Sequence, residues 1–260
     1  MKHKPLTELT ILDLIKARIR HGDQAIPDPL NAKTDLSFPG FPSFAKQDDA
    51  SWQQARKACP TGAIGENTLD LGRCVFCGVC QRNFPETFVF SNSFKMGASC
   101  REMLVLDGSL TPEAYAACSI TSTPDIRKLF GRSFKLRSIS AGGCAACELE
   151  LNASTNVNFD INRYGIDIVA SPRHADAIVI TGPITQNMAY ALEETWRAVP
   201  ALKILILAGA CAISGGLFSE APALNREFLN KVDAMLYLPG CPVHPLTIAH
   251  GITALIGRKR

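Results

Sequence analysis

The sequence lacks a hydrophobic run long enough to cross a lipid bilayer. Its longest apolar stretch, Ile204 to Ile213, is about half of what a spanning helix needs. The apolar residues near the start are interrupted by Glu8, Asp13 and Lys16, which excludes the continuous apolar core of a secretion signal. We therefore expect a cytoplasmic protein without a direct membrane span, in which any membrane attachment comes through partner chains.

The chain also lacks a strong charge of either sign. It has 27 Lys and Arg residues against 24 Asp and Glu residues, and the basic residues are scattered except for Arg258 to Arg260. Nucleic-acid binding therefore gains no support from charge. With 47% hydrophobic and 20% charged residues over 260 positions, the composition excludes wholesale disorder and leaves room for two modest domains.

No secretion signal accompanies the ten cysteines, which argues against a disulfide framework because the cytosol keeps thiols reduced. Metal ligation is the leading explanation. Eight of the ten fall into two groups of four, which we call the N-terminal quartet (Cys59, Cys74, Cys77 and Cys80) and the C-terminal quartet (Cys144, Cys147, Cys211 and Cys241). Cys100 and Cys118 match neither quartet and are interpreted as single thiols without a site.

The N-terminal quartet has the spacing of a bacterial ferredoxin. Such ferredoxins hold two 4Fe-4S clusters with two copies of C-x2-C-x2-C-x3-C-P, and the fourth Cys of each copy ligates the other cluster. Cys74, Cys77 and Cys80 begin the second copy, and Cys59-Pro60 ends the first. Together these four cysteines supply the complete set of ligands for one cluster. A tetrahedral zinc site is the alternative, although three thiols this close together are unusual for zinc.

The other ferredoxin site has lost its ligands. The positions where thiolates are expected hold Asp49, Trp52, Ala55 and Phe84 instead of cysteine. This region therefore resembles a two-cluster ferredoxin domain that has kept one site, with apolar residues filling the vacated one.

From Phe134 onward the pattern changes to apolar strands separated by helices. We expect strands at 135–140, 167–170, 177–181, 203–208 and 234–238, and helices near 148–155, 187–199, 223–232 and 243–256. This alternation predicts an α/β fold with a doubly wound, flavodoxin-like parallel sheet, preceded by a small α+β ferredoxin-like domain. The predicted division is a helix and extended strap over 1–50, the ferredoxin-like domain over 51–120 with a helix at 111–119, a linker over 121–133 and the α/β domain over 134–260.

The cysteines of the C-terminal quartet each follow a predicted strand closely, in a glycine-containing loop. The loops after parallel strands meet at the carboxyl edge of the sheet, near the point where strand order reverses. Four thiolates at that edge predict a second 4Fe-4S cluster, with the nearby glycines allowing close approach of the backbone. The alternative is that these residues are small buried hydrophobic side chains at strand ends.

The same residues resemble the small subunit of complex I-related, membrane-bound group 4 NiFe hydrogenases, including that of formate hydrogenlyase (the NADH:ubiquinone oxidoreductase 20 kDa subunit family). The resemblance covers about 134–257. The motifs that carry it are Gly143-Cys144-Ala145-Ala146-Cys147-Glu148-Leu149-Glu150, Ser171-Pro172-Arg173-His174-Ala175-Asp176, Thr181-Gly182-Pro183-Ile184-Thr185, Gly209-Ala210-Cys211 and Gly240-Cys241-Pro242. The complex I subunit has two adjacent cysteines where Cys144 and Cys147 are separated, so the hydrogenase branch fits better.

This resemblance implies an electron-transfer subunit. It implies a partner large subunit that holds the NiFe centre, further iron-sulfur and membrane subunits, and a peripheral position on the inner face of the cell membrane. The N-terminal half resembles the ferredoxin-type subunit of the same complexes, which implies two subunits fused in one chain. A related complex without NiFe chemistry stays open, as does a non-redox, zinc-stabilised scaffold.

Two acidic residues follow the first cysteine pair of the C-terminal quartet. Glu148 and Glu150 lie where a helix is expected to begin, and acidic side chains there suit the helix dipole. A proton-relay role at the interface with the large subunit is the alternative interpretation for both.

Overall fold

The computed structural model describes residues 10–22, 25–45 and 48–258. Its C-terminal half is built on a five-stranded, all-parallel sheet with the strand order β6-β5-β7-β8-β9. This order confirms the flavodoxin-like α/β prediction. The strands are β5 (Phe134–Ser140), β6 (Ile166–Ile168), β7 (Ala177–Thr181), β8 (Ile204–Ala208) and β9 (Leu236–Leu238).

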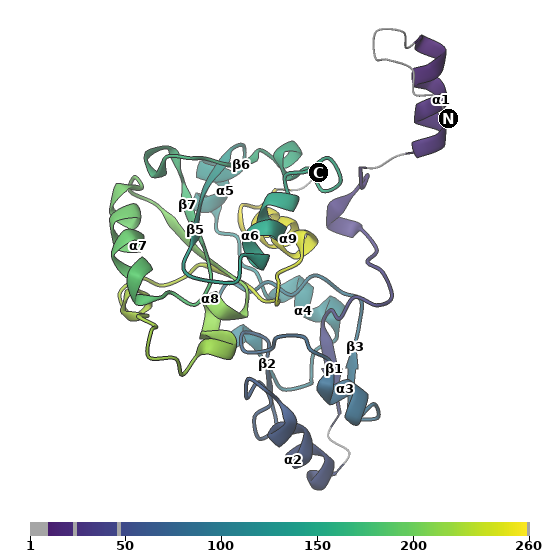
Figure 1. Ribbon diagram of the computed structural model, residues 1–260, viewed down its shortest axis with the longest axis vertical. Coiled ribbons are helices and arrows are strands. Elements are labelled where there is room, and N and C mark those ends of the chain that lie inside the picture. The colour runs from purple at the N-terminus through teal and green to yellow at the C-terminus, as the bar shows by residue number, and fades with distance from the viewer. Residues whose placement is uncertain (1–9, 23–24, 46–47, 259–260) are drawn as a thin grey trace.

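Helices cover both faces of this sheet, because neighbouring strand residues point to opposite sides. On β8, Ile204 and Ile206 belong to one core cluster while Leu205 and Leu207 belong to the other. The first face packs against α5 (Pro124–Phe130), α6 (Ala146–Ala153) and α9 (Pro245–Leu255). The second face packs against α7 (Gln186–Ala198), α8 (Ala210–Ser214) and the N-terminal half (Figure 1).

The N-terminal half consists of short elements around a small apolar core. Two two-stranded antiparallel sheets join β1 (Pro42–Phe44) to β3 (Phe88–Phe90) and β2 (Leu69–Asp70) to β4 (Val105–Leu106). The helices are α2 (Asp49–Ala58), α3 (Val79–Asn83) and α4 (Pro112–Cys118), the last confirming the helix expected at 111–119. Thr111 caps α4 by accepting a hydrogen bond from the Ala114 N–H at 3.2 Å.

The chain begins, as far as it is described, with an amphipathic helix that extends away from the rest of the molecule. Helix α1 (Ile11–His21) starts with a capping box between Thr10 and Asp13. The part of the predicted helix before residue 10 lies outside the described residues. An extended strap then runs alongside the body to β1 (Figure 1), and its described residues from 25 onward include a short 3-10 turn at Pro29–Asn31.

The two halves share one seam. Ala98 forms an antiparallel bridge with Tyr237 on the outer edge of β9, with N···O distances of 3.0 and 2.8 Å. The Thr247 hydroxyl of α9 donates to the carbonyl oxygen of Phe94 at 2.9 Å. One core cluster contains residues of both halves, so their side chains pack as a continuous interior.

Two segments differ from the local structure expected of them. The expected linker contains α5, whose Ile126 and Phe130 are buried, and Thr123 caps it by accepting from the Ile126 N–H. The helix expected at 223–232 is reduced to a 3-10 turn at Glu227–Asn230. The backbone just before this turn pairs with the segment after β7: the Asn225 N–H donates to the Ile184 carbonyl oxygen at 2.9 Å. A continuous helix would lose that pairing.

Within the described ranges, no helix is both long and apolar enough to span a membrane.

Candidate metal centres

The N-terminal quartet lines one small apolar cavity. Cys59 follows α2, Cys74 and Cys77 lie in the loop before α3, and Cys80 lies in its first turn. Cys74 is buried, Cys59 and Cys80 are half-buried, and Cys77 is exposed. The thiols thus surround a pocket with one side open to solvent.

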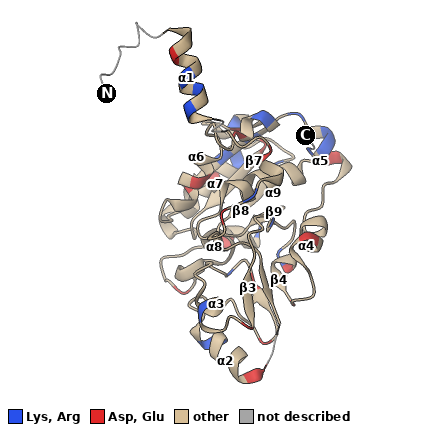
Figure 2. Ribbon diagram, turned by 90° about the vertical axis from the view of Figure 1, so that its right-hand side faces the viewer, with Lys and Arg blue, Asp and Glu red and all other residues tan. Residues whose placement is uncertain are grey.

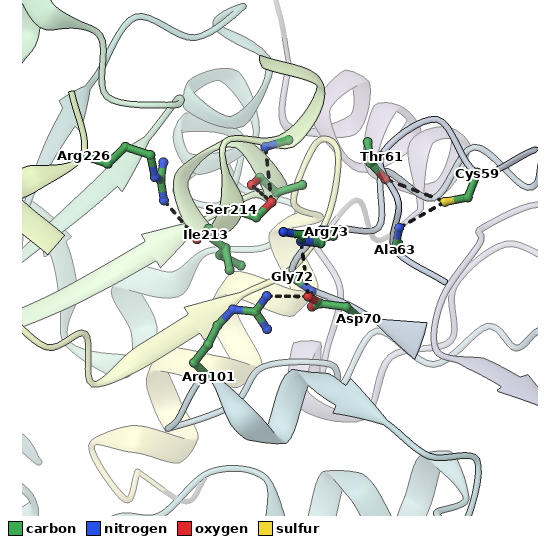
Figure 3. A network of polar contacts seen from close by, with 12 residues as sticks. Cys59, Thr61, Ala63, Asp70, Gly72, Arg73, Arg101, Ile213, Ser214 and Arg226 are labelled. Carbon is green, nitrogen blue, oxygen red and sulfur yellow. Dashed lines mark hydrogen bonds and ion pairs between the residues drawn. The ribbon is translucent and has the colours of Figure 1, made fainter. Parts of the chain in front are cut away.

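Backbone N–H groups already point at two of these sulfurs. The Phe76 N–H donates to Cys74 Sγ at 3.4 Å. The Ala63 N–H donates to Cys59 Sγ at 3.3 Å, as Figure 3 shows. Phe76 has the left-handed backbone conformation with φ at 53°, which is strained for a bulky residue. Amide donors directed at sulfur stabilise a thiolate.

Three of the four positions where the ferredoxin pattern predicts further ligands hold side chains of the core. Trp52 and Ala55 of α2 are fully buried, and Phe84 packs against the same core cluster. The Trp52 ring stacks on Phe88 with centroids 5.1 Å apart. Asp49 lies in the exposed first turn of α2. Apolar side chains thus occupy most of the positions where the ferredoxin pattern would place ligands of a second cluster.

The C-terminal quartet lies at the carboxyl edge of the parallel sheet. Cys144 is in the loop after β5, Cys147 is in the first turn of α6, Cys211 is in α8 directly after β8, and Cys241 is three residues past β9. Gly209 makes room among them, since a Cβ added to it would lie 2.6 Å from Cys147 Sγ. Its φ of 91° also favours glycine.

Thiols of the C-terminal quartet lie close enough to influence one another. Burial raises the pKa of Cys147 to about 12, and the neighbouring Cys241 and Cys211 add to the increase. Burial likewise raises the pKa of Cys211, with further contributions from Cys241 and Cys144. The side chains from two loops and two helices therefore share one charge environment.

The N-terminal quartet behaves in the same way. Burial raises the pKa of Cys74 to about 12 and that of Cys80 to about 11. The other thiols of the quartet raise both values further. Without a bound cation, these buried thiols keep their protons at neutral pH.

Arg226 places a half-buried positive charge beside the C-terminal quartet. Its guanidinium donates to the carbonyl oxygens of Pro183, Cys211, Ala212 and Ile213 at 2.7 to 3.1 Å, and Figure 3 shows the contact with Ile213. Burial lowers the pKa of this guanidinium, while Cys211 raises it. Arg226 thus holds the last turn of α8 and lies next to a prospective ligand. Sequence reasoning missed this residue, because an isolated arginine matches no motif.

The two quartets are neighbours. Cys77 is among the charges that raise the pKa of Cys241, after burial and Cys144. Phe76 and Cys241 also line the same cavity between the two halves, together with Phe38, Met96 and His244. Gly72 packs against Ile213 of α8, where a Cβ would lie 2.7 Å from the Ile213 side chain. The seam therefore brings the two sites together.

Glu148 and Glu150 have different surroundings. Glu148 accepts a hydrogen bond from the Thr181 hydroxyl at 2.7 Å, which directs its carboxylate toward the end of β7. Glu150 is half-buried at the cavity that contains Cys241, and burial raises the pKa of its carboxyl group. Both lie beside the C-terminal quartet, and their role as proton carriers stays a prediction.

Cys100 and Cys118 are exposed and line neither site.

Across residues 10–22, 25–45 and 48–258, no three side chains of His, Cys, Asp or Glu are gathered tightly enough to hold a single metal ion.

Comparisons with known proteins place the likeness in the C-terminal half. Residues 144–255 match the family described as "NADH ubiquinone oxidoreductase, 20 Kd subunit". The matched segment includes the whole C-terminal quartet, whereas the N-terminal quartet lies outside it.

Three curated relatives illustrate the range of this likeness. The chain is 34% identical over 125 residues to "Probable membrane-bound hydrogenase subunit mbhJ" of Pyrococcus furiosus, covering 48% of this chain and 75% of that protein. It is 36% identical over 130 residues to "Formate hydrogenlyase subunit 7" of Escherichia coli, covering 50% of this chain and 51% of the relative. It is 35% identical over 123 residues to "NADH-quinone oxidoreductase subunit 6" of Thermus thermophilus, covering 45% of this chain and 65% of that protein. The match thus spans about half of the formate hydrogenlyase subunit.

Proposed function

Because this chain belongs to the family of the 20 Kd subunit of NADH ubiquinone oxidoreductase, we propose that it is an iron-sulfur electron-transfer subunit of a multisubunit membrane-bound complex. The observation that carries the proposal is the meeting of Cys144, Cys147, Cys211 and Cys241 at the carboxyl edge of the sheet. The name of each relative describes a subunit of a hydrogenase, a hydrogenlyase or a quinone oxidoreductase.

Each quartet suits one 4Fe-4S cluster. Four thiolates are the ligands such a cluster takes, and amide donors near the sulfurs tune its potential. The N-terminal quartet supplies such donors from Phe76 and Ala63, and Gly209 leaves space beside Cys147 in the C-terminal one. The raised pKa values of Cys74 and Cys147 imply that ligation releases protons, since a thiolate must replace each thiol.

When bound, the two clusters would supply one-electron carriers. The exposed Cys77 side of the N-terminal quartet is the entry point in this proposal, because the other thiols are more deeply buried. Phe76 and Cys241 line one cavity, so they would form the contact through which the two sites communicate. The N-terminal half would act as a fused ferredoxin-type subunit.

The finer proposal is that the complex is a NiFe hydrogenase of the formate hydrogenlyase type. The C-terminal cluster would exchange electrons with a NiFe centre on a partner large subunit, and the N-terminal cluster with an outside donor such as a formate dehydrogenase, a carbon monoxide dehydrogenase or a soluble ferredoxin. The spacing of Cys144 and Cys147 favours this branch. The second candidate is the same role in a complex I-like assembly without NiFe chemistry, which the quinone oxidoreductase relative supports.

Metal analysis of the native complex tests these proposals. The complex is captured anaerobically through this chain, its companion chains are identified, and its iron, nickel and zinc are measured. We expect about eight iron atoms per copy of this chain from its two 4Fe-4S clusters, beyond those of the companions. Nickel in the complex supports the hydrogenase, and its absence supports the complex I-like role. The isolated chain with zinc in place of iron would contradict the redox function.

A further inference from the structure

Helix α1 exposes an apolar surface that no other described part of the chain covers. Ile11 and Ile19 are each 76% exposed, Leu12 is 66% exposed and Ile15 is 48% exposed. No residue of α1 is buried. Figures 1 and 2 both show the helix extending away from the two halves. An exposed apolar patch of this kind marks an interaction surface.

Two of the three basic side chains of α1 lie on the side of the helix away from its apolar stripe, while the third, Arg18, lies next to that stripe. Ile11, Ile15 and Ile19 recur every four residues and form one stripe. Lys16 and Arg20, also four apart, fall on the far side of the helix from Ile11. Among its eleven residues α1 has three basic side chains, Lys16, Arg18 and Arg20, against one acidic side chain.

That acidic side chain belongs to the start of the helix. The Asp13 carboxylate accepts from the Thr10 N–H at 3.1 Å and closes the capping box. Its charge therefore stabilises the first turn, where the helix dipole favours an anion. The remainder of the helix presents only positive charge beside the apolar stripe.

From these features we propose that α1 binds in the surface layer of an anionic lipid membrane. A short helix with an apolar stripe and a basic polar face lies in the plane of such a surface, with its apolar side chains among the acyl chains. The basic residues complement anionic headgroups. A helix of this length is marginal in water, so burial of its apolar stripe would also stabilise it.

The contacts at the base of the strap give this attachment a fixed place on the body. The Ile26 N–H donates to the Asn158 carbonyl oxygen at 2.8 Å. The Arg163 guanidinium donates to the carbonyl oxygens of Ile26 and Pro27 at 3.1 and 3.2 Å. Only a few residues separate these contacts from α1, so the α/β domain would stay close to the membrane. The chain would then have a membrane contact of its own, besides those made through partners.

Vesicle flotation of the purified full chain tests the proposal without any partner. The probes are vesicles of phosphatidylcholine alone and of phosphatidylcholine with phosphatidylglycerol. We expect the chain to float with the anionic vesicles and to lose binding as salt is raised. Ile15→Asp should abolish flotation. Lys16→Glu with Arg20→Glu should weaken it at least about tenfold, since each basic residue near an anionic surface contributes roughly fivefold.

Leu202→Asp is the matched control, because Leu202 is a 71% exposed apolar residue away from α1. It should float like the unchanged chain, and the far-ultraviolet circular dichroism spectrum of each variant reports whether the body is intact. Lack of flotation of the unchanged chain would overturn the proposal, and so would equal flotation of the Ile15→Asp variant. Binding of α1 only to a membrane subunit of the complex, and not to vesicles, would assign the helix to a protein partner instead. These outcomes are independent of the metal content of the two quartets.

Discussion

The two quartets are assembled over very different distances along the chain. The N-terminal quartet lies within 22 residues, from Cys59 to Cys80, and is shaped by two helix ends and one tight loop. The C-terminal quartet spans Cys144 to Cys241 and meets only because β5, β8 and β9 end at the same edge of one parallel sheet, with β7 between β5 and β8. The first site depends on local geometry, while the second depends on the pairing of the whole sheet. Damage to the sheet should therefore affect the C-terminal site and leave the N-terminal site intact.

The largest expected effect is the loss of one cluster at a time. Cys77→Ala should remove only the N-terminal electron paramagnetic resonance signal and Cys211→Ala only the C-terminal one, each lowering the iron content by about four atoms. Cys118→Ala, an exposed thiol outside both quartets, is the control and should change nothing. Loss of both signals from either quartet variant would show that the sites are not separable.

A substitution that creates a cavity beneath the sheet should weaken the C-terminal site before the N-terminal one. Ile206 is fully buried in β8 on the face that packs against α9. Ile206→Ala should lower the free energy of unfolding by about 2–4 kcal/mol. On gradual heating we expect the C-terminal signal to disappear before the N-terminal one. Simultaneous loss would mean that the two halves unfold as one unit through their shared seam.

Removal of the Arg226 charge should affect the potential of one site only. Arg226→Gln takes a half-buried cation away from Cys211 and leaves carbonyl oxygens without their donor, so the C-terminal cluster should become harder to reduce. A tenfold change in the one-electron equilibrium corresponds to about 59 mV. The N-terminal potential should stay the same.

Two further variants show whether a changed potential in Arg226→Gln comes from the lost charge or from a weakened fold. Arg226→Lys keeps the charge and should retain most of the C-terminal potential while losing thermal stability. Arg197→Gln removes an exposed arginine of α7 and should alter neither property. An unchanged potential in Arg226→Gln, with stability lost, would limit Arg226 to a structural role.

The smallest expected effect concerns the seam between the halves. His250 of α9 packs against Phe94, and burial and the nearby Lys95 lower its pKa to about 4. Lys33 and Glu113 line the same cavity from the strap and α4. Because the pKa of an unfolded histidine is about 6.5, the unfolded chain takes up the proton first as the pH falls.

Stability contributed by neutral His250 is thus complete above about pH 6.5 and is lost toward about pH 4. Between about pH 7.5 and about pH 5.5, the free energy of unfolding should fall by about 1 kcal/mol more in the unchanged chain than in His250→Gln. Thermal melts of both chains at each pH, with iron content checked, measure this difference. Equal pH slopes would rule out His250 as the group responsible.

The local character of the N-terminal quartet explains why its residues could be predicted from spacing alone. The C-terminal quartet needed one more step, since its cysteines could be grouped only after the strands had been identified and their carboxyl ends placed at one edge. Of the four helices expected in the α/β half, three are present as α6, α7 and α9, and the short helix α8 was not expected. The segment at 223–232 has helical spacing, but its backbone pairs with residues 184–186 instead. No local pattern reveals such a long-range pairing.

The missed helix α5 did have a local signal. Thr123-Pro124 repeats the Thr111-Pro112 pair that begins α4, with a capping side chain followed by a proline in the first turn. Arg226 is different, because its importance comes from four carbonyl oxygens that only the folded loops bring together.

The bridge between Ala98 and Tyr237 has a consequence for any attempt to divide the chain. A parallel sheet that ends in β9 would present an unpaired row of backbone donors and acceptors, which is a template for self-association. Here part of that row is occupied by a segment from the N-terminal half. A fragment cut between α4 and β5 would uncover that edge, so the α/β half produced alone should tend to aggregate unless the missing piece is supplied as a separate chain.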